Sequence, residues 1–205
     1  MTQDLKTHTP STLATRLLDV VENDISPLTR AGVQKGNKIF GAAILLKADL
    51  SLVLAGTNNE IENPLWHGEM HTLKQLYELI PAERRPAPAD CIFFSTHEPC
   101  TLCLSAITWA GYDNFTYLFS HEDSRDSFNI PHDLRILKEV FTLEPGGYNK
   151  SNAYWDSQSV GDLIAQCSAD EKAEFAERLT RIEKTYGEFS DIYQASKGTN
   201  EIPLN

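Results

Sequence analysis

The feature that most restricts the fold of this chain is a pair of short motifs rich in metal-binding side chains. The first is His67-Gly68-Glu69, and the second is Pro99-Cys100-Thr101-Leu102-Cys103. Two cysteines three positions apart share one face of a helix, and a helix N-terminus stabilises the thiolate form that binds metals. Pro99 stands just before the first turn of such a helix. A fold that uses both motifs in one site must bring two helix starts together.

Apolar periodicity predicts the elements around these motifs. Residues 11–30 have helical spacing, residues 39–46 and 52–55 read as a hairpin, and residues 91–95 read as a buried strand. We expect further helices from His67 to Ile80 and over the apolar segment CTLCLSAITWA, which we predict to be buried on all sides. Alternation over residues 115–119 predicts another strand. Strands alternating with helices favour an α/β protein with some parallel pairing.

The composition changes after Pro145-Gly146-Gly147. An aromatic, amide-rich segment, YNKSNAYW, is followed by a helix from about residue 169, where Ser168 and Glu171 match a capping box. We therefore predict one domain over residues 1–144 and a C-terminal helical extension over residues 145–205, packed on the same domain.

Charge and composition restrict the partners. The formal net charge of −11 disfavours nucleic acid, whose binding depends on basic side chains, and favours a small-molecule substrate. We find neither an uncharged apolar run long enough to span a bilayer nor a basic N-terminal region followed by an apolar one, so we expect a cytoplasmic protein without membrane contact. In that compartment the four cysteines indicate metal or redox chemistry rather than disulfides.

The two motifs could form either a catalytic or a structural metal site. Catalytic zinc has three protein ligands and an open position for water, which suits His67, Cys100 and Cys103, with Glu69 free to move protons. A Cys-x-x-Cys is also typical of a redox pair or of half a structural zinc site. A structural site would need a fourth ligand, for which Cys91 and His97 are the candidates.

Other side chains near the motifs have two interpretations each. His71 lies one turn after His67 and could share the metal, but the order of HGEMH is not that of a zinc-peptidase helix. Four aromatic side chains, Trp66, Trp109, Tyr154 and Trp155, could stack on a flat ring, although a single aromatic is more often core or interface. Trp66 is the preferred candidate because it adjoins a ligand.

Over about residues 38–140 the chain resembles the cytidine deaminase-like superfamily, in its guanine, cytosine and tRNA-adenosine deaminase branch. The similarity lies in KIFGAAILLK followed by GTNN, in NPLWHGEMHTL, and in THEPCTLCLSAITWAG, which contain the H-x-E and P-C-x-x-C signature of zinc deaminases. It implies a three-layer α/β/α fold with a central mixed five-stranded sheet, one Zn²⁺ per chain, and a homodimer. It also implies that Asn58 of Gly-x-Asn binds the base. We add Gly68 and Glu98, from the two motifs, to the expected substrate-binding residues.

The resemblance implies a hydrolase of nucleobase metabolism that replaces a ring amine by a carbonyl and releases ammonia. HGEMHTL is similar to fungal cytosine deaminase, whereas EPCTLC, ITWAG and DSRDSF are closer to bacterial guanine deaminase, in which an acidic residue near the C-terminus shuttles protons. Asp126 is its expected counterpart. We rank guanine first, cytosine second and tRNA adenosine third, with a non-catalytic zinc-stabilised binding module as the alternative from another class. The loop between Asn58 and His67 is shorter than in these relatives, so the pocket and its substrate could differ.

Overall fold

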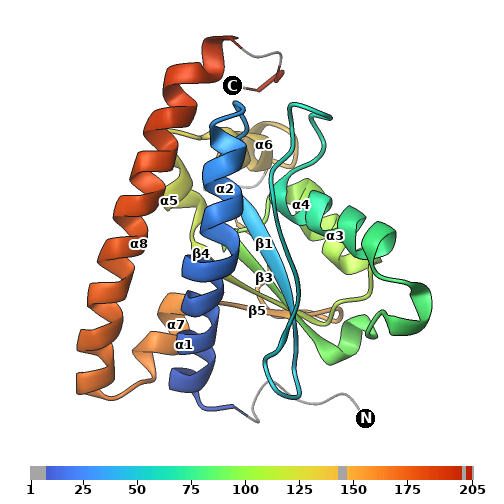
Figure 1. Ribbon diagram of the computed structural model, residues 1–205, viewed down its shortest axis with the longest axis vertical. Coiled ribbons are helices and arrows are strands. Elements are labelled where there is room, and N and C mark those ends of the chain that lie inside the picture. The colour runs from blue at the N-terminus through green and yellow to red at the C-terminus, as the bar shows by residue number, and fades with distance from the viewer. Residues whose placement is uncertain (1–7, 143–146, 200–201, 205) are drawn as a thin grey trace.

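The computed structural model describes residues 8–142, 147–199 and 202–204 of the chain, arranged as helices on both faces of one sheet (Figure 1). The strands are β1 (Gly41–Leu46), β2 (Leu52–Thr57), β3 (Cys91–His97), β4 (Asn114–Phe119) and β5 (Asp156–Ser159). The helices are α1 (Pro10–Val20), the π-helical η2 (Val21–Ile25), α2 (Ser26–Val33), α3 (Gly68–Leu79), α4 (Thr101–Trp109), α5 (His121–Asp126), α6 (His132–Glu139), α7 (Val160–Ala165) and α8 (Ala169–Ser196), with short 3-10 turns at Ala82–Arg84, Pro88–Asp90 and Lys197–Thr199. Within the described ranges, no helix is both long enough and apolar enough to cross a membrane.

The sheet is mixed, as predicted. Its strand order is β2-β1-β3-β4-β5, in which β1 pairs antiparallel with β2 and β3, while β3 and β4, and then β4 and β5, run parallel. The predicted hairpin is the β1–β2 pair. The fifth strand, β5, comes from the segment assigned to the C-terminal extension, so that segment completes the sheet. The predicted boundary between residues 144 and 145 lies outside the described residues.

Two apolar clusters fill the two faces of the sheet. Alternate side chains along the strands point to opposite faces, so Ala43 and Phe94 join the cluster under α1, α2, α7 and α8, while Ala42 and Phe93 join the cluster under α3 and α4. Figure 1 shows the same division, with α1, α2 and α8 on one side and α3 and α4 on the other. The fold is therefore a three-layer α/β/α sandwich.

The N-terminal and C-terminal helices pack against each other. The predicted first helix is present, but it is divided into α1, η2 and α2. The predicted capping box at α8 is also present, since the Ser168 hydroxyl accepts from Glu171 N and the Glu171 carboxylate accepts from Ser168 N. Arg178 of α8 donates to Asp19 at 2.7 Å and to Glu22 at 2.6 Å, which ties the extension to the first helix.

The prediction that α4 is buried on all sides is wrong. Only Cys103 and Ile107 are buried, whereas Leu102 and Ser105 are exposed and Trp109 is 91% exposed. The apolar composition concealed the orientation, because one face of α4 packs on the sheet and no described segment covers the opposite face.

Candidate active site

Two helix N-termini meet beyond the carboxyl end of β3. Cys100 is the N-cap residue of α4, which follows β3 after a short turn, and His67 is the N-cap residue of α3. Both residues have extended backbones there, so their side chains can reach forward to the neighbouring helix start. Cys103, one turn into α4, projects to the same point.

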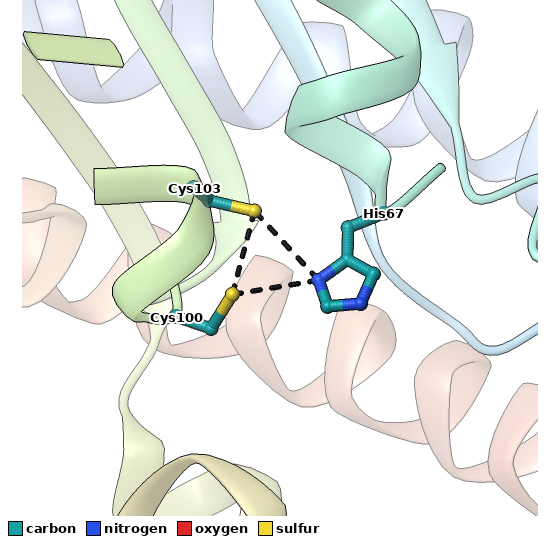
Figure 2. A group of neighbouring side chains, drawn as sticks. All are labelled: His67, Cys100 and Cys103. Atoms are coloured by element: carbon teal, nitrogen blue, oxygen red, sulfur yellow. Dashed lines mark hydrogen bonds between the residues drawn. The ribbon is translucent and has the colours of Figure 1, made fainter. Parts of the chain in front are cut away.

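The side chains of His67, Cys100 and Cys103 converge as the sequence predicted (Figure 2). His67 Nδ1 lies 3.4 Å from Cys100 Sγ and 3.8 Å from Cys103 Sγ, and the two sulfur atoms are 3.5 Å apart. Two sulfurs and one imidazole nitrogen form a donor set that suits zinc. Among the described residues no fourth histidine, cysteine or carboxylate joins this group, so the three residues fit a metal with an open position.

The protonation of the group favours a bound cation. The hydrogen bond between Cys100 and Cys103, together with the imidazole of His67, holds the pKa of Cys100 well below its usual range. Burial raises the pKa of Cys103, as does the charge of Cys100. Burial alone would lower the pKa of His67, but Cys100, Glu60 and Glu69 raise it to about 9. At neutral pH these shifts place one proton on Cys103 and a second on the imidazole of His67, and a metal ion bound by the three residues would replace both.

Glu69 lies beside the ligands without being one of them. Its side chain is buried in the first turn of α3, and its Oε2 accepts a hydrogen bond from Cys103 Sγ at 3.3 Å. Burial and the negative charge of Cys100 raise the pKa of Glu69 to about 7. A carboxyl group that titrates near neutral pH can both accept and return a proton.

Two of the three metal-binding residues, His67 and Cys100, line a cavity of ≈ 360 Å³. Its polar lining residues are Lys38, Glu60, His67, Glu69, His97, Glu98, Thr101, His132 and Asp133. Its apolar lining residues include Phe40, Leu65, Leu102, Ile130, Ile136, Ile202 and Leu204. The apolar walls come from the loop after β2, from α6 and from the C-terminal residues. A cavity with such walls and a polar floor suits a small ring with several hydrogen-bonding groups.

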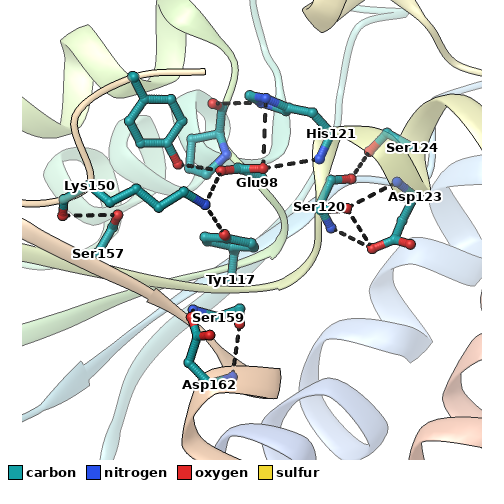
Figure 3. A network of polar contacts seen from close by, with 12 residues as sticks. Glu98, Tyr117, Ser120, His121, Asp123, Ser124, Lys150, Ser157, Ser159 and Asp162 are labelled. Atoms are coloured by element: carbon teal, nitrogen blue, oxygen red, sulfur yellow. Dashed lines mark hydrogen bonds and ion pairs between the residues drawn. The ribbon is translucent and has the colours of Figure 1, made fainter. Parts of the chain in front are cut away.

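Glu98 is buried at the edge of this cavity, in a polar network (Figure 3). Its Oε1 accepts from Tyr148 at 2.6 Å and from Lys150 at 2.9 Å, and its Oε2 accepts from His121 N at 3.0 Å. Lys150 also donates to the hydroxyl of Tyr117. Burial alone would raise the pKa of Glu98, but His121 and these hydrogen bonds hold it below its usual range. The YNKSNAYW segment therefore fixes an ionised carboxylate two residues before Cys100.

Other predicted site residues lie near the cavity without lining it. Asn58 is 1% exposed, and its Nδ2 donates to Glu60. Gly68 packs so closely on β1 that an added Cβ would lie 2.9 Å from Gly41 Cα. Its small size is therefore accounted for by helix packing. Trp66 is half-buried, with Lys74 Nζ 5.7 Å from the centre of its ring.

The remaining predicted substrate contacts lie elsewhere in this structure. Trp155 is buried against Phe115 and donates to Thr108 at 2.9 Å, while Trp109 is exposed at the end of α4. Asp126 is exposed at the end of α5 and paired with Arg125. None of these three side chains lines the cavity, because each lies on an outward or sheet-facing surface. Their role in substrate binding stays a prediction.

The alternative metal ligands are also placed elsewhere. His71 Nδ1 bonds the carbonyl of Thr57 at 2.7 Å, and Cys91 begins β3, at the opposite end from the metal group. His97 lines the cavity, but its ring packs among the aromatic side chains of Phe40, Phe119 and Phe128.

Sequence reasoning missed several polar groups of the cavity, chiefly Lys38, Glu60, His132 and Asp133. Burial, together with the charge of Cys100, raises the pKa of Asp133 to about 6. These residues belong to no motif and stand in charged stretches that are typical of a solvated surface. The one available signal was Glu60, a carboxylate two residues after the Asn58 of Gly-x-Asn.

Comparison with known proteins defines the class of this fold and site. Residues 23–119 match the sequence model of the cytidine and deoxycytidylate deaminase zinc-binding region. This stretch contains β1 to β4 and both metal-binding motifs, so over these residues the chain is similar to zinc-binding deaminases.

Particular relatives are guanine deaminases. The chain is 30% identical over 90 residues to the guanine deaminase of Bacillus subtilis (strain 168), which covers 43% of this chain and 54% of that protein. The match thus spans about half the length of this curated relative. A solved guanine deaminase of Nitrosomonas europaea is 18% identical, with a TM-score of 0.47 over 83% of this chain and 84% of that one. A solved Bacillus subtilis guanine deaminase is 25% identical, with a TM-score of 0.41 over 63% of this chain and 94% of that one.

Proposed function

We propose that this protein is a zinc-dependent hydrolytic deaminase of a free nucleobase or small aminated heterocycle, with guanine as the favoured substrate. The observation that carries the proposal is the meeting of three metal-binding side chains and the buried acid Glu69 at one cavity. The guanine deaminase of Bacillus subtilis, which matches part of the chain, supports guanine over the other bases.

In the proposed reaction His67, Cys100 and Cys103 would hold the zinc. A bound zinc would supply the chemistry of a water molecule with its pKa lowered to about 7, which would make a nucleophile available at neutral pH. Glu69, with its pKa raised to about 7, would take one proton from the attacking water and give it to a ring nitrogen as the oxygen adds to the amine-bearing carbon. It would then take the second proton, from the hydroxyl group formed on that carbon, and pass it to the departing amine. The ring gains a carbonyl and ammonia leaves.

The cavity lining supports a substrate that carries several hydrogen-bond donors. Glu98 and Asp133 present carboxyl groups among the lining residues, and Lys38 adds an ammonium group that is paired with Glu60. Ring N–H and amino groups, such as those of guanine, would meet acceptors there. The net charge of −11 supports a free base over tRNA.

The decisive experiment is ammonia release by the zinc-loaded protein from guanine, cytosine, adenine, their nucleosides, pterins and aminotriazines. We expect release from guanine that is lost in Glu69→Ala, while that variant keeps its zinc. Glu62→Ala, which removes an exposed carboxylate of the neighbouring loop, is the matched control and should keep activity. A fully active Glu69→Ala would exclude the proposed proton transfers.

The metal assignment has a separate test. Cys100→Ala should lose zinc as well as activity, because one of only three proposed protein ligands is gone. Normal zinc content in that variant would contradict the ligand set. Release from cytosine alone would move the assignment to the second candidate. A tRNA anticodon stem, added to the panel as a further substrate, would move it to the third if it alone released ammonia.

The assembly and location remain part of the proposal. We propose a cytoplasmic homodimer in which residues 1–144 form the deaminase domain and residues 145–205 form an extension that contributes a strand and helices to it. Sedimentation analysis of the purified chain would test the dimer.

A further inference from the structure

A single buried carboxylate, that of Glu60, connects three groups beside the candidate metal site. Its side chain is 2% exposed, in the loop that follows β2. Glu60 Oε1 accepts a hydrogen bond from Lys38 Nζ at 2.9 Å and lies 3.7 Å from His67 Nε2. Glu60 Oε2 accepts from Asn58 Nδ2 at 2.5 Å. The proton-transfer steps proposed above make no use of this carboxylate.

The position of Glu60 distinguishes the two nitrogens of His67. Nδ1 faces the two cysteine sulfurs, whereas Nε2 faces Glu60. A carboxylate beside Nε2 stabilises a proton there, which leaves the lone pair of Nδ1 directed at the sulfurs. Carboxylates that orient a metal-binding histidine through its other nitrogen raise metal affinity.

Neighbouring groups hold Glu60 in place. Lys38 is itself buried, with a side chain 6% exposed, so the two opposite charges compensate each other in a region of low polarity. The loop is fixed on both sides of Glu60, since Asn59 N donates to Trp66 O at 2.8 Å and Ile61 N donates to Asn37 Oδ1 at 3.0 Å. The carboxylate is therefore preorganised rather than free to rotate into solvent.

Glu60 also determines how Asn58 presents its amide. Because Nδ2 of Asn58 donates to Glu60, its Oδ1 is left as an acceptor. That oxygen is buried and has no hydrogen-bond partner within the described part of the chain. A buried acceptor without a partner is costly unless a donor completes it, and a ring N–H or amino group is such a donor.

We infer that Glu60 is a positioning residue, which directs His67 Nδ1 toward the metal and fixes the amide of Asn58 as an acceptor. The inference rests on the proposed metal site, and it adds a residue to which neither the motifs nor the comparisons assign a role.

The test measures metal binding rather than turnover. Zinc affinity is determined by competition with a chromogenic chelator, and ligand geometry by the absorption spectrum of the Co²⁺-loaded protein. We expect Glu60→Gln to weaken zinc binding about 10- to 100-fold and to shift the cobalt bands. The matched control is Glu62→Gln, since exposed Glu62 accepts from Asn59 Nδ2 at 2.5 Å in the same way but contacts no metal-binding side chain.

A second variant separates positioning from folding. Glu60→Gln leaves Lys38 buried without its counterion, so the double variant Lys38→Met/Glu60→Gln removes both charges together. We expect the double variant to fold and still bind zinc 10- to 100-fold more weakly than the wild type. Wild-type affinity and an unchanged cobalt spectrum in the folded double variant would overturn the inference while leaving the proposed deaminase intact. A wild-type protein that binds no zinc would overturn both.

Discussion

The buried imidazole of His97 makes the stability of this protein sensitive to acid. The residue is 3% exposed, and the ring centres of Phe40, Phe119 and Phe128 lie 4.8, 5.0 and 5.2 Å from its own. Its Nε2 has no hydrogen-bond partner among the described residues. Burial, with a smaller contribution from His121, lowers the pKa of His97 to about 3.

The sign and size of the effect follow from this pKa. An unfolded histidine titrates near 6.5, so between pH 6.5 and 3 the unfolded chain binds a proton that the folded chain does not. The contribution of His97 to the free energy of unfolding is complete above pH 6.5 and falls as the pH falls. From pH 7 to 4.5 the loss is about 2.5 kcal/mol, at roughly 1.4 kcal/mol per pKa unit. Because pH 4.5 lies above the folded pKa, the size of the loss depends little on that value.

His97→Phe isolates this term. Phenylalanine keeps the ring contacts without a titrating nitrogen, and Thr96 keeps its hydrogen bonds to Gly41. Urea unfolding of both proteins at pH 7 and 4.5, with equal metal loading, cancels the contributions of all other groups. We expect the variant to lose about 2.5 kcal/mol less stability than the wild type over this interval. Equal losses would refute a neutral, buried His97.

Three further predictions concern packing, capping and charge. Gly68→Ala should destabilise the protein by about 1–3 kcal/mol in urea unfolding, because its Cβ would overlap the backbone of Gly41; unchanged stability would show that α3 can move away from β1. Ser168→Ala should lower the free energy of unfolding by about 1 kcal/mol through loss of the α8 cap. If the capping box is reciprocal, Glu171→Ala should cost less stability in the Ser168→Ala variant than in the wild type, and equal costs would contradict it. Arg178→Met should lower thermal stability by about 1 kcal/mol at low salt and by less at high salt, whereas a salt-independent loss would point to packing.

Local sequence signals predicted the metal group because its geometry is local. Cys100 and Cys103 are three positions apart at the start of α4, which places them on the same face of that helix. His67 and Glu69 are two positions apart at the start of α3. The same applies to the capping box at Ser168. Each of these features depends on a spacing of a few residues, which the sequence displays directly.

The rest of the cavity depends on packing between distant segments. Lys38 and Glu60 pair across a hairpin, and Asp133 reaches the site from α6, so no short spacing reveals them. The exposed face of α4 was not predicted for a different reason: the composition of α4 is that of a buried helix. Aromatic residues chosen for their chemistry, such as Trp155, turned out to be packed under the sheet.

The network at Glu98 allows a test of how the YNKSNAYW segment supports the site. Tyr148 and Lys150 donate to the same oxygen, Oε1, so removing one leaves the other to satisfy it. Tyr148→Phe and Lys150→Met should each cost about 1 kcal/mol in urea unfolding, while the double variant should cost at least 1 kcal/mol more than their sum, because Oε1 would then be buried without a donor. Simple additivity would mean that water replaces the lost donors and that the segment does not hold Glu98 in place.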